Sequence, residues 1–144
     1  HGEGVDFYEV SEWGANYKGG STVLEGKLKK SVDYKNPIRI PSVSFRDYFG
    51  KSQVESNQNI VKMDIEGAEY EVLNDLIEGG LLDAISVLSV EFHVDKFKDS
   101  AINIGVHDKL IGRLFDQQGR QGFSFFYEGV PGRRNKMCSA PPSR

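Results

Sequence analysis

The stretch from Asn59 to His93 constrains the fold of this chain more than any other feature of its sequence. Residues 59–65 form a short, mostly apolar and β-branched run, which predicts a β-strand. Helical periodicity follows without a spacer, and a second apolar run from Ile85 to Phe92 predicts another strand. Because the connection is long enough for a crossover, the stretch predicts a parallel βαβ unit.

The helix between the two strands is amphipathic. Its apolar positions share one face: Ala68, Val72, Leu73 and Leu76. Acidic and amide side chains are expected on the other face: Glu69, Glu71, Asn74, Asp75 and Glu78. Glu66 and Glu69 are expected in the first turn, where carboxylates complement the positive helix end, and Gly79-Gly80 is expected to end the helix. We therefore expect this helix to pack by one face.

Polar side chains mark the ends of both predicted strands. Asp64 and Glu66 follow the first strand, and Glu91 and His93 end the second. Glu91 and His93 are two residues apart and so share a face of their strand, whereas Phe92 points the other way. Ligands of open α/β sheets bind beyond the carboxyl ends of parallel strands, so three carboxylates and an imidazole are expected to meet there.

Two runs in this region have a specific pattern. Residues 61–73 read VKMDIEGAEYEVL and residues 88–93 read LSVEFH, and together they closely resemble the signature of the FkbM family of S-adenosylmethionine-dependent methyltransferases. A run of the form Lys-x-Asp-x-Glu-Gly-x-Glu after an apolar strand is rarely met by chance. The resemblance implies an α/β fold, with a Rossmann-like class I methyltransferase sheet and helices on both faces. It also implies methyl transfer from S-adenosylmethionine to a hydroxyl oxygen of a small molecule or sugar.

The resemblance also implies a motif that this chain lacks. Members of the family are expected to begin with a strand and a glycine-rich turn that holds the cofactor, followed by a strand that ends in an acid for the ribose. Gly2-Glu3-Gly4 does not fit, because a strand and not a helix follows it. We therefore expect the chain to lack the N-terminal cofactor-loop half of the domain and to bind S-adenosylmethionine weakly by itself.

The resemblance and the strand-end positions together give candidate roles. Asp64, Glu91 and His93 are the candidate catalytic residues, and Asp64 and His93 are suited to taking a proton from an acceptor hydroxyl. Asp64, Glu66 and Gly67 are candidate cofactor contacts. Asp64 and Glu91, with His93, could also hold Mg²⁺, which prefers oxygen ligands.

Each candidate also has a purely structural interpretation. Asp64 could cap the following helix or pair with Lys62, and Glu66 could complement the helix dipole. Gly67 could serve a left-handed turn, and His93 could be a histidine with satisfied hydrogen bonds at the start of a loop. Two other functions stay open: a Mg²⁺-dependent hydrolase that uses the same acids, and a non-catalytic, methyltransferase-like assembly module.

The composition limits the class of partner. The chain has 144 residues, 38% of them hydrophobic and 27% charged, which is typical of one globular domain. Its net charge of -3 argues against a general nucleic-acid binder. Cys138 is the single cysteine and has no disulfide or zinc-ligand partner. No apolar run reaches the roughly 18 to 20 residues of a membrane span, and no signal peptide opens the chain, so we expect a cytoplasmic protein with no membrane partner.

With the resemblance, we expect residues 1–144 to form one partial methyltransferase domain with four parts. Residues 1–58 are expected to be a β-rich segment, residues 59–93 the signature βαβ unit, residues 94–130 a helix and a terminal strand, and residues 131–144 a polar tail.

Finer expectations follow from the local patterns. The first part has predicted strands at 5–10 and 37–45, a short helix at 45–49, and a solvated face with Lys27, Lys29 and Lys30. In the third part, residues 94–104 are expected to be a charged surface loop that could act as a substrate lid. A helix at 106–118 is expected to end at Gly119, with His107 at the surface, and a strand is expected at 122–128.

One edge of the predicted sheet lacks an obvious partner. The strand from Ile60 to Asp64 pairs on one side with the strand from Ile85 to Phe92, and its other side is left open. An open apolar edge invites pairing with another chain. We therefore expect either that Val5–Val10 covers this edge or that the chain associates with itself through it.

Overall fold

The computed structural model describes residues 4–10, 20–27, 32–51, 59–96 and 100–129. Its elements follow in this order: β1 (Val5–Phe7), β2 (Ile38–Ile40), α1 (Phe45–Lys51), β3 (Asn59–Met63), α2 (Glu69–Glu78), the 3₁₀ turn η1 (Leu81–Ala84), β4 (Ile85–Glu91), the 3₁₀ turn η2 (Val94–Lys96), α3 (Ser100–Gln121) and β5 (Ser124–Glu128). The predicted tail at 131–144, with Cys138, lies outside the described residues, as do Lys29 and Lys30.

A three-stranded parallel sheet, in the order β3-β4-β5, organises the larger part of the molecule. The predicted βαβ unit is confirmed, because β3 and β4 are parallel neighbours joined by α2. Met63 at the end of β3 lies opposite Val90 of β4. The carboxyl ends of the two strands therefore lie side by side, and the residues that follow them can meet.

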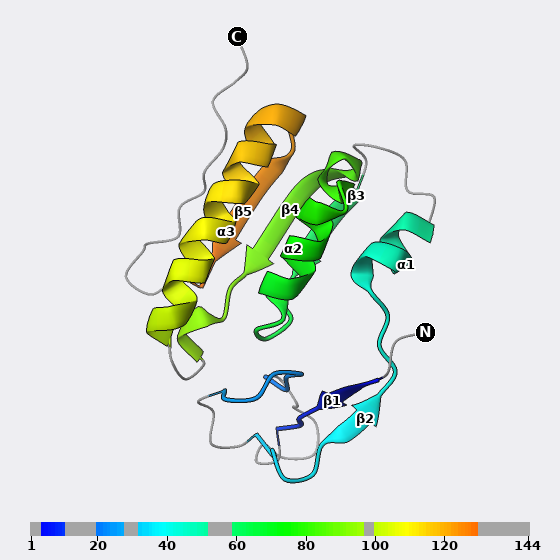
Figure 1. Ribbon diagram of the computed structural model, residues 1–144, viewed down its shortest axis with the longest axis vertical. Coiled ribbons are helices and arrows are strands. Elements are labelled where there is room, and N and C mark those ends of the chain that lie inside the picture. Colours follow the sequence, from blue (N-terminus) through cyan, green and yellow to red (C-terminus); the bar gives the residue numbers. More distant parts are fainter. Residues whose placement is uncertain (1–3, 11–19, 28–31, 52–58, 97–99, 130–144) are drawn as a thin grey trace.

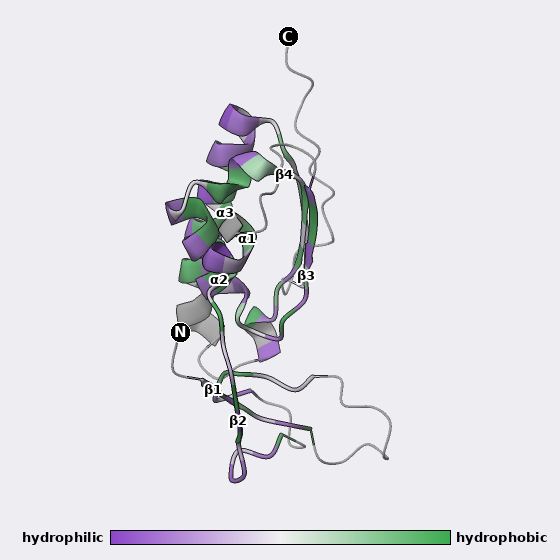
Figure 2. Ribbon diagram, turned by 90° about the vertical axis from the view of Figure 1, so that its right-hand side faces the viewer, coloured by the Kyte–Doolittle hydropathy of each residue, from purple (hydrophilic) through white to green (hydrophobic). Residues whose placement is uncertain are grey.

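The helices lie on one face of this sheet. Figure 2 shows α1, α2 and α3 together on one side of the strands. The expectation of helices on both faces is therefore wrong for the described residues. On the opposite face, the side chain of Ile60 is 76% exposed. The observed architecture is mixed α/β with a parallel sheet.

The main core fills the space between the sheet and the helices. Apolar residues of alternate strand positions face the apolar sides of α2 and α3, as the two periodicities require. The fully buried members include Leu73, Leu76, Leu88, Leu114, Phe92 and Phe125. This core holds α2 against β3 and β4, and it fixes where the first residues of α2 lie relative to the strand ends.

A smaller antiparallel layer lies at the carboxyl ends of β3 and β4 (Figure 1). β1 pairs with β2, and isolated bridges join Tyr8 to Thr22 and Val10 to Val32. The predicted strand at 5–10 is thus confirmed in its first half, as β1. It pairs within its own layer, so Val5–Val10 does not cover the open edge of β3. Association through that edge stays a prediction.

Helix α3 differs from its prediction at both ends. It begins at Ser100, six residues before the predicted start, so part of the predicted surface loop is helical. Gly119 lies inside the helix, where an exposed glycine is tolerated at a cost of about 1 kcal/mol relative to alanine. The stop is Gly122, whose φ of 76° is the left-handed conformation that ends helices. In the described part of the chain, no helix has the length and apolar character needed to cross a membrane.

Candidate functional site

A tight turn joins β3 to α2, and a buried carboxylate holds it. Glu66 has a positive φ of 55° and Gly67 a φ of 113°, so the chain reverses sharply here. The Glu69 carboxylate accepts backbone N–H groups from Ile65 at 3.1 Å and from Gly67 at 3.0 and 3.1 Å. Its side chain is fully buried. The expectation of Glu69 on the polar face of the helix is wrong, because the turn and the sheet enclose it.

The geometry of this turn tests the structural interpretations given above for Asp64, Glu66 and Gly67. Helix α2 begins at Glu69, so Glu66 precedes the helix and is not in its first turn. No side-chain hydrogen bond caps the N-terminus of α2, so Asp64 is not a helix cap. The positive φ of Gly67 confirms that glycine serves the turn. Among the described contacts, no ion pair joins Lys62 to Asp64, and both side chains are exposed.

Glu69 also orients His93, which follows β4. The Nδ1 atom of His93 lies 2.8 Å from Oε1 of Glu69, and both side chains are buried. A carboxylate that already accepts two backbone N–H groups is the acceptor here, so Nδ1 is the donor. This bond fixes the ring and leaves the Nε2 atom directed at the ends of the two strands.

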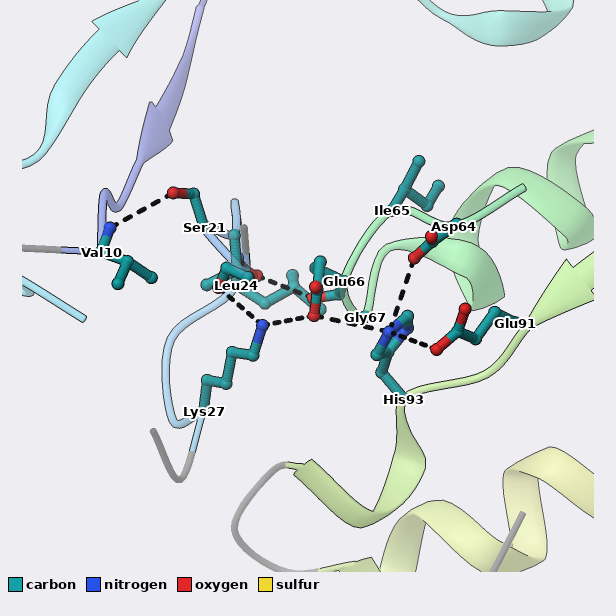
Figure 3. A network of polar contacts seen from close by, with 12 residues as sticks. Val10, Ser21, Leu24, Lys27, Asp64, Ile65, Glu66, Gly67, Glu91 and His93 are labelled. Carbon is teal, nitrogen blue, oxygen red and sulfur yellow. Dashed lines mark hydrogen bonds and ion pairs between the residues drawn. The ribbon is translucent and has the colours of Figure 1, made fainter. Parts of the chain in front are cut away.

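Three carboxylates surround Nε2 of His93 (Figure 3). The distances from Nε2 are 3.5 Å to Oε2 of Glu66, 3.6 Å to Oδ1 of Asp64 and 3.6 Å to Oε1 of Glu91. The predicted convergence of these four residues is thus confirmed. We call these four residues and Glu69 the strand-end cluster.

The members of the strand-end cluster differ in exposure. The side chain of His93 is 1% exposed, whereas those of Asp64 and Glu91 are 41% and 34% exposed. His93 is therefore enclosed by the protein, whereas the carboxylates of Asp64 and Glu91 are accessible to a ligand. Ligating atoms of Asp64, Glu91 and His93 all lie within 4.8 Å of one another, so these three residues could hold a metal ion.

The charges of the cluster act on each other. Burial works to lower the pKa of His93, but the hydrogen bond and charge of Glu69, together with the charge of Glu66, outweigh it and raise that pKa above its ordinary value. Burial works to raise the pKa of Glu66, but the hydrogen bond and charge of Lys27 outweigh it and lower that pKa. For Glu66 and His93, pairing with opposite charge therefore outweighs desolvation in setting the direction of the pKa shift.

We call the smaller antiparallel layer the N-terminal layer. Its Lys27 contacts the turn between β3 and α2. The ammonium of Lys27 donates to the Glu66 carboxylate and, at 2.6 Å, to the carbonyl of Gly20. The hydroxyl of Thr22 donates to the backbone carbonyl of Glu66 at 2.9 Å. The expectation that Lys27 lies on a solvated face is wrong, because the residue is 5% exposed. Nothing in the local lysine pattern distinguishes it, since its partner is 39 residues away.

A groove elsewhere on the molecule contains none of these residues. It has a volume of about 530 Å³ and lies between the segment before α1 and the outer side of α2. Its lining residues are Val43, Ser44, Phe45, Glu71, Val72, Asn74, Asp75 and Glu78. The strand-end cluster, and not this groove, brings together the residues that the sequence singles out.

Comparison with known proteins adds one match. A family model described as the methyltransferase FkbM domain matches residues 2–128. No curated protein and no solved structure matches the chain.

Proposed function

This chain belongs to the FkbM methyltransferase family, and from that premise we propose that it transfers a methyl group from S-adenosylmethionine to a hydroxyl oxygen of a small molecule or sugar. The family membership supports methyl transfer in general. The donor, the hydroxyl acceptor and a Rossmann-like class I architecture for the whole domain are part of the proposal.

The observation that carries this proposal is the position and charge of the strand-end cluster. It lies beyond the carboxyl ends of two adjacent parallel strands, where α/β sheets bind their ligands. Asp64 and Glu91 are its accessible carboxylates, and His93 lies directly behind them. A hydroxyl group that approaches the cluster would therefore meet acceptors for its proton from both strands.

Methyl transfer to oxygen requires what this arrangement offers. The hydroxyl oxygen attacks the methyl carbon of the sulfonium, the carbon–sulfur bond breaks, and the sulfur becomes a neutral thioether. The proton of the hydroxyl must leave, and positioned carboxylates assist that step. The protein contributes chiefly by holding the two reactants in line. We assign the acceptor contact to Asp64 and Glu91.

The roles of Glu66 and Gly67 as cofactor contacts stay predictions. The Glu66 carboxylate is bound to Lys27, and Gly67 is buried within the turn. In the proposed function these residues therefore shape the turn, and Asp64 is the one candidate cofactor contact with a substantially exposed side chain. The turn places Asp64 on the solvent-accessible side of the strand-end cluster.

The test is methyl transfer by the natural protein that contains this chain. It is incubated with S-adenosylmethionine and a panel of hydroxyl-bearing small molecules and sugars, and S-adenosylhomocysteine and the methylated product are measured by mass spectrometry. Asp64→Asn should abolish most of the product, whereas Asp116→Asn, an exposed position on α3, should not. If the protein binds neither S-adenosylmethionine nor S-adenosylhomocysteine and methylates no acceptor, the result would favour an assembly module. Cation-dependent hydrolysis without the donor would favour a hydrolase.

A further inference from the structure

We propose that Asp64, Glu91 and His93 form a binding site for a divalent metal cation. This inference concerns the same site as the proposed function, and only its catalytic consequence rests on that function. The ligand atoms would be one carboxylate oxygen from each acid and Nε2 of His93, which lie within 4.8 Å of one another.

The spacing of these atoms matches a coordination sphere. Divalent cations lie about 2.0 to 2.6 Å from oxygen and nitrogen ligands, so neighbouring ligand atoms are roughly 3 to 3.6 Å apart and opposite ones about 4 to 5 Å apart. Nε2 of His93 lies 3.6 Å from an oxygen of Asp64 and 3.6 Å from an oxygen of Glu91. A cation among the three atoms would contact all of them with little movement.

The Nε2 atom of His93 gives an independent indication. It is fully buried and has no hydrogen-bond partner among the described residues. Because Nδ1 donates to Glu69, Nε2 of the neutral ring has a lone pair that points at carboxylate oxygens, an unfavourable arrangement. If Nε2 carried a proton, the three oxygens would still lie 3.5 to 3.6 Å from the nitrogen, too far for a good hydrogen bond. A cation would satisfy all these lone pairs at once.

Glu69 completes a familiar arrangement around such a site. Histidine ligands of metal ions almost always donate the N–H of the second ring nitrogen to a carboxylate, a backbone carbonyl or water, which orients the ring and raises its basicity. Glu69 does this for His93 at 2.8 Å, from a position held by two backbone N–H groups. Glu69 is therefore a positioning residue and not a ligand.

The net charge around the site also favours a cation. Four carboxylates surround His93: Asp64, Glu66, Glu69 and Glu91. Among the described residues, the positive groups that act on Glu66 and His93 are the ammonium groups of Lys27 and Lys96. Negative charge is thus in excess, and it is concentrated where the two strands end.

The ligand set indicates the class of cation. Carboxylates suit Mg²⁺ and Mn²⁺, and imidazole suits Zn²⁺ and other first-row transition metals, so the mixed set favours a first-row divalent ion. Asp64 and Glu91 are partly exposed, which leaves coordination positions for water or a substrate hydroxyl. With a cation bound, Asp64 and Glu91 would act on the acceptor through it and not directly. A hydroxyl held at a free coordination position would lose its proton to solvent more readily, and its oxygen would then accept the methyl group from the sulfonium.

Titration of the chain with Mn²⁺ alone tests the inference. Free Mn²⁺ is followed by electron paramagnetic resonance, without donor or acceptor present. We expect one bound ion per chain, and weakening by about tenfold or more in Asp64→Asn and in Glu91→Gln. Asp116→Asn is the matched control, and circular dichroism establishes that each variant is folded. In nitrogen-15 spectra, bound Mn²⁺ should broaden the imidazole signals of His93 far more than those of His107.

Three outcomes would overturn the inference. They are no binding, binding that Asp64→Asn and Glu91→Gln leave unchanged, and broadening that spares His93; the last two indicate an adventitious ion only. Binding at this site without methyl transfer would support the inference and count against the proposed function. Methyl transfer by a chain that binds no cation would do the reverse.

Discussion

Two histidines of this molecule are buried in very different surroundings. The side chains of His93 and His107 are both almost fully buried. Consecutive residues at the start of α2 hold them, since Glu69 contacts Nδ1 of His93 at 2.8 Å and Tyr70 contacts Nδ1 of His107 at 3.1 Å. One short segment of helix therefore supports two buried imidazoles in the same way.

The rest of each environment separates the two. His93 faces three carboxylates. His107 lies among aromatic rings, with the ring centroid of Phe92 at 4.6 Å and perpendicular to it, and those of Tyr70 and Tyr127 at 6.0 and 6.3 Å. We call this second group the aromatic cluster. Burial of an imidazole is thus common to a site and to a core, and the charge beside it distinguishes them.

The largest expected effect is on activity and belongs to the strand-end cluster. Asp64→Asn keeps the shape of the side chain but removes its charge, so turnover should fall by about 10² to 10⁴-fold, the usual range for loss of assistance to proton transfer. Stability should change little because Asp64 is partly exposed. Turnover of the natural protein and its melting temperature are the two measurements. Full activity in a folded variant would remove Asp64 from the site.

The largest expected loss of stability belongs to Phe92, which the aromatic cluster shares with the main core. Its side chain is 1% exposed and packs against Tyr70, His107 and Tyr127. Phe92→Ala should lower the free energy of unfolding by about 3 to 5 kcal/mol, because it leaves a cavity. Urea denaturation measures this loss. A change below about 1 kcal/mol would mean that the Phe92 ring is not tightly packed in the aromatic cluster.

A smaller loss of stability is expected where the N-terminal layer meets the strand-end cluster. Lys27→Met keeps most of the buried stem but leaves the Glu66 carboxylate without its ammonium partner. We expect a loss of about 3 kcal/mol, the low end for a broken buried pair, because Glu66 keeps some exposure. Lys35→Met, at an exposed lysine of the same layer, is the control for urea denaturation. Equal stability of both variants would show that Lys27 does not anchor the turn.

The smallest expected effect sharpens the comparison between the two histidines. Tyr70→Phe removes the hydroxyl that contacts His107 and should cost about 1 kcal/mol, the net value of a typical hydrogen bond. Turnover should stay at the wild-type level, because the aromatic cluster contains none of the residues to which we assign the acceptor contact. A loss of turnover as large as that of Asp64→Asn would join the two clusters into one site.

The strand ends were predictable because their pattern is local. A run of β-branched residues, a helix with one apolar face and a second apolar run specify β3, α2 and β4. Parallel pairing then brings Asp64, Glu91 and His93 to one edge, and the alternation along a strand places Glu91 and His93 on one face. The sequence by itself therefore determined the βαβ unit and most of the strand-end cluster.

The tertiary structure alone decided which polar residues are buried. Helical periodicity places Glu69 among exposed acids, a nearby cluster of lysines suggests that Lys27 is solvated, and His107 reads as a surface residue. All three are buried, because each finds a partner far along the chain: Glu69 with His93, Lys27 with Glu66, and His107 with Tyr70. Burial of a polar group is favourable only when such a partner compensates the loss of water, and a local pattern does not contain that partner.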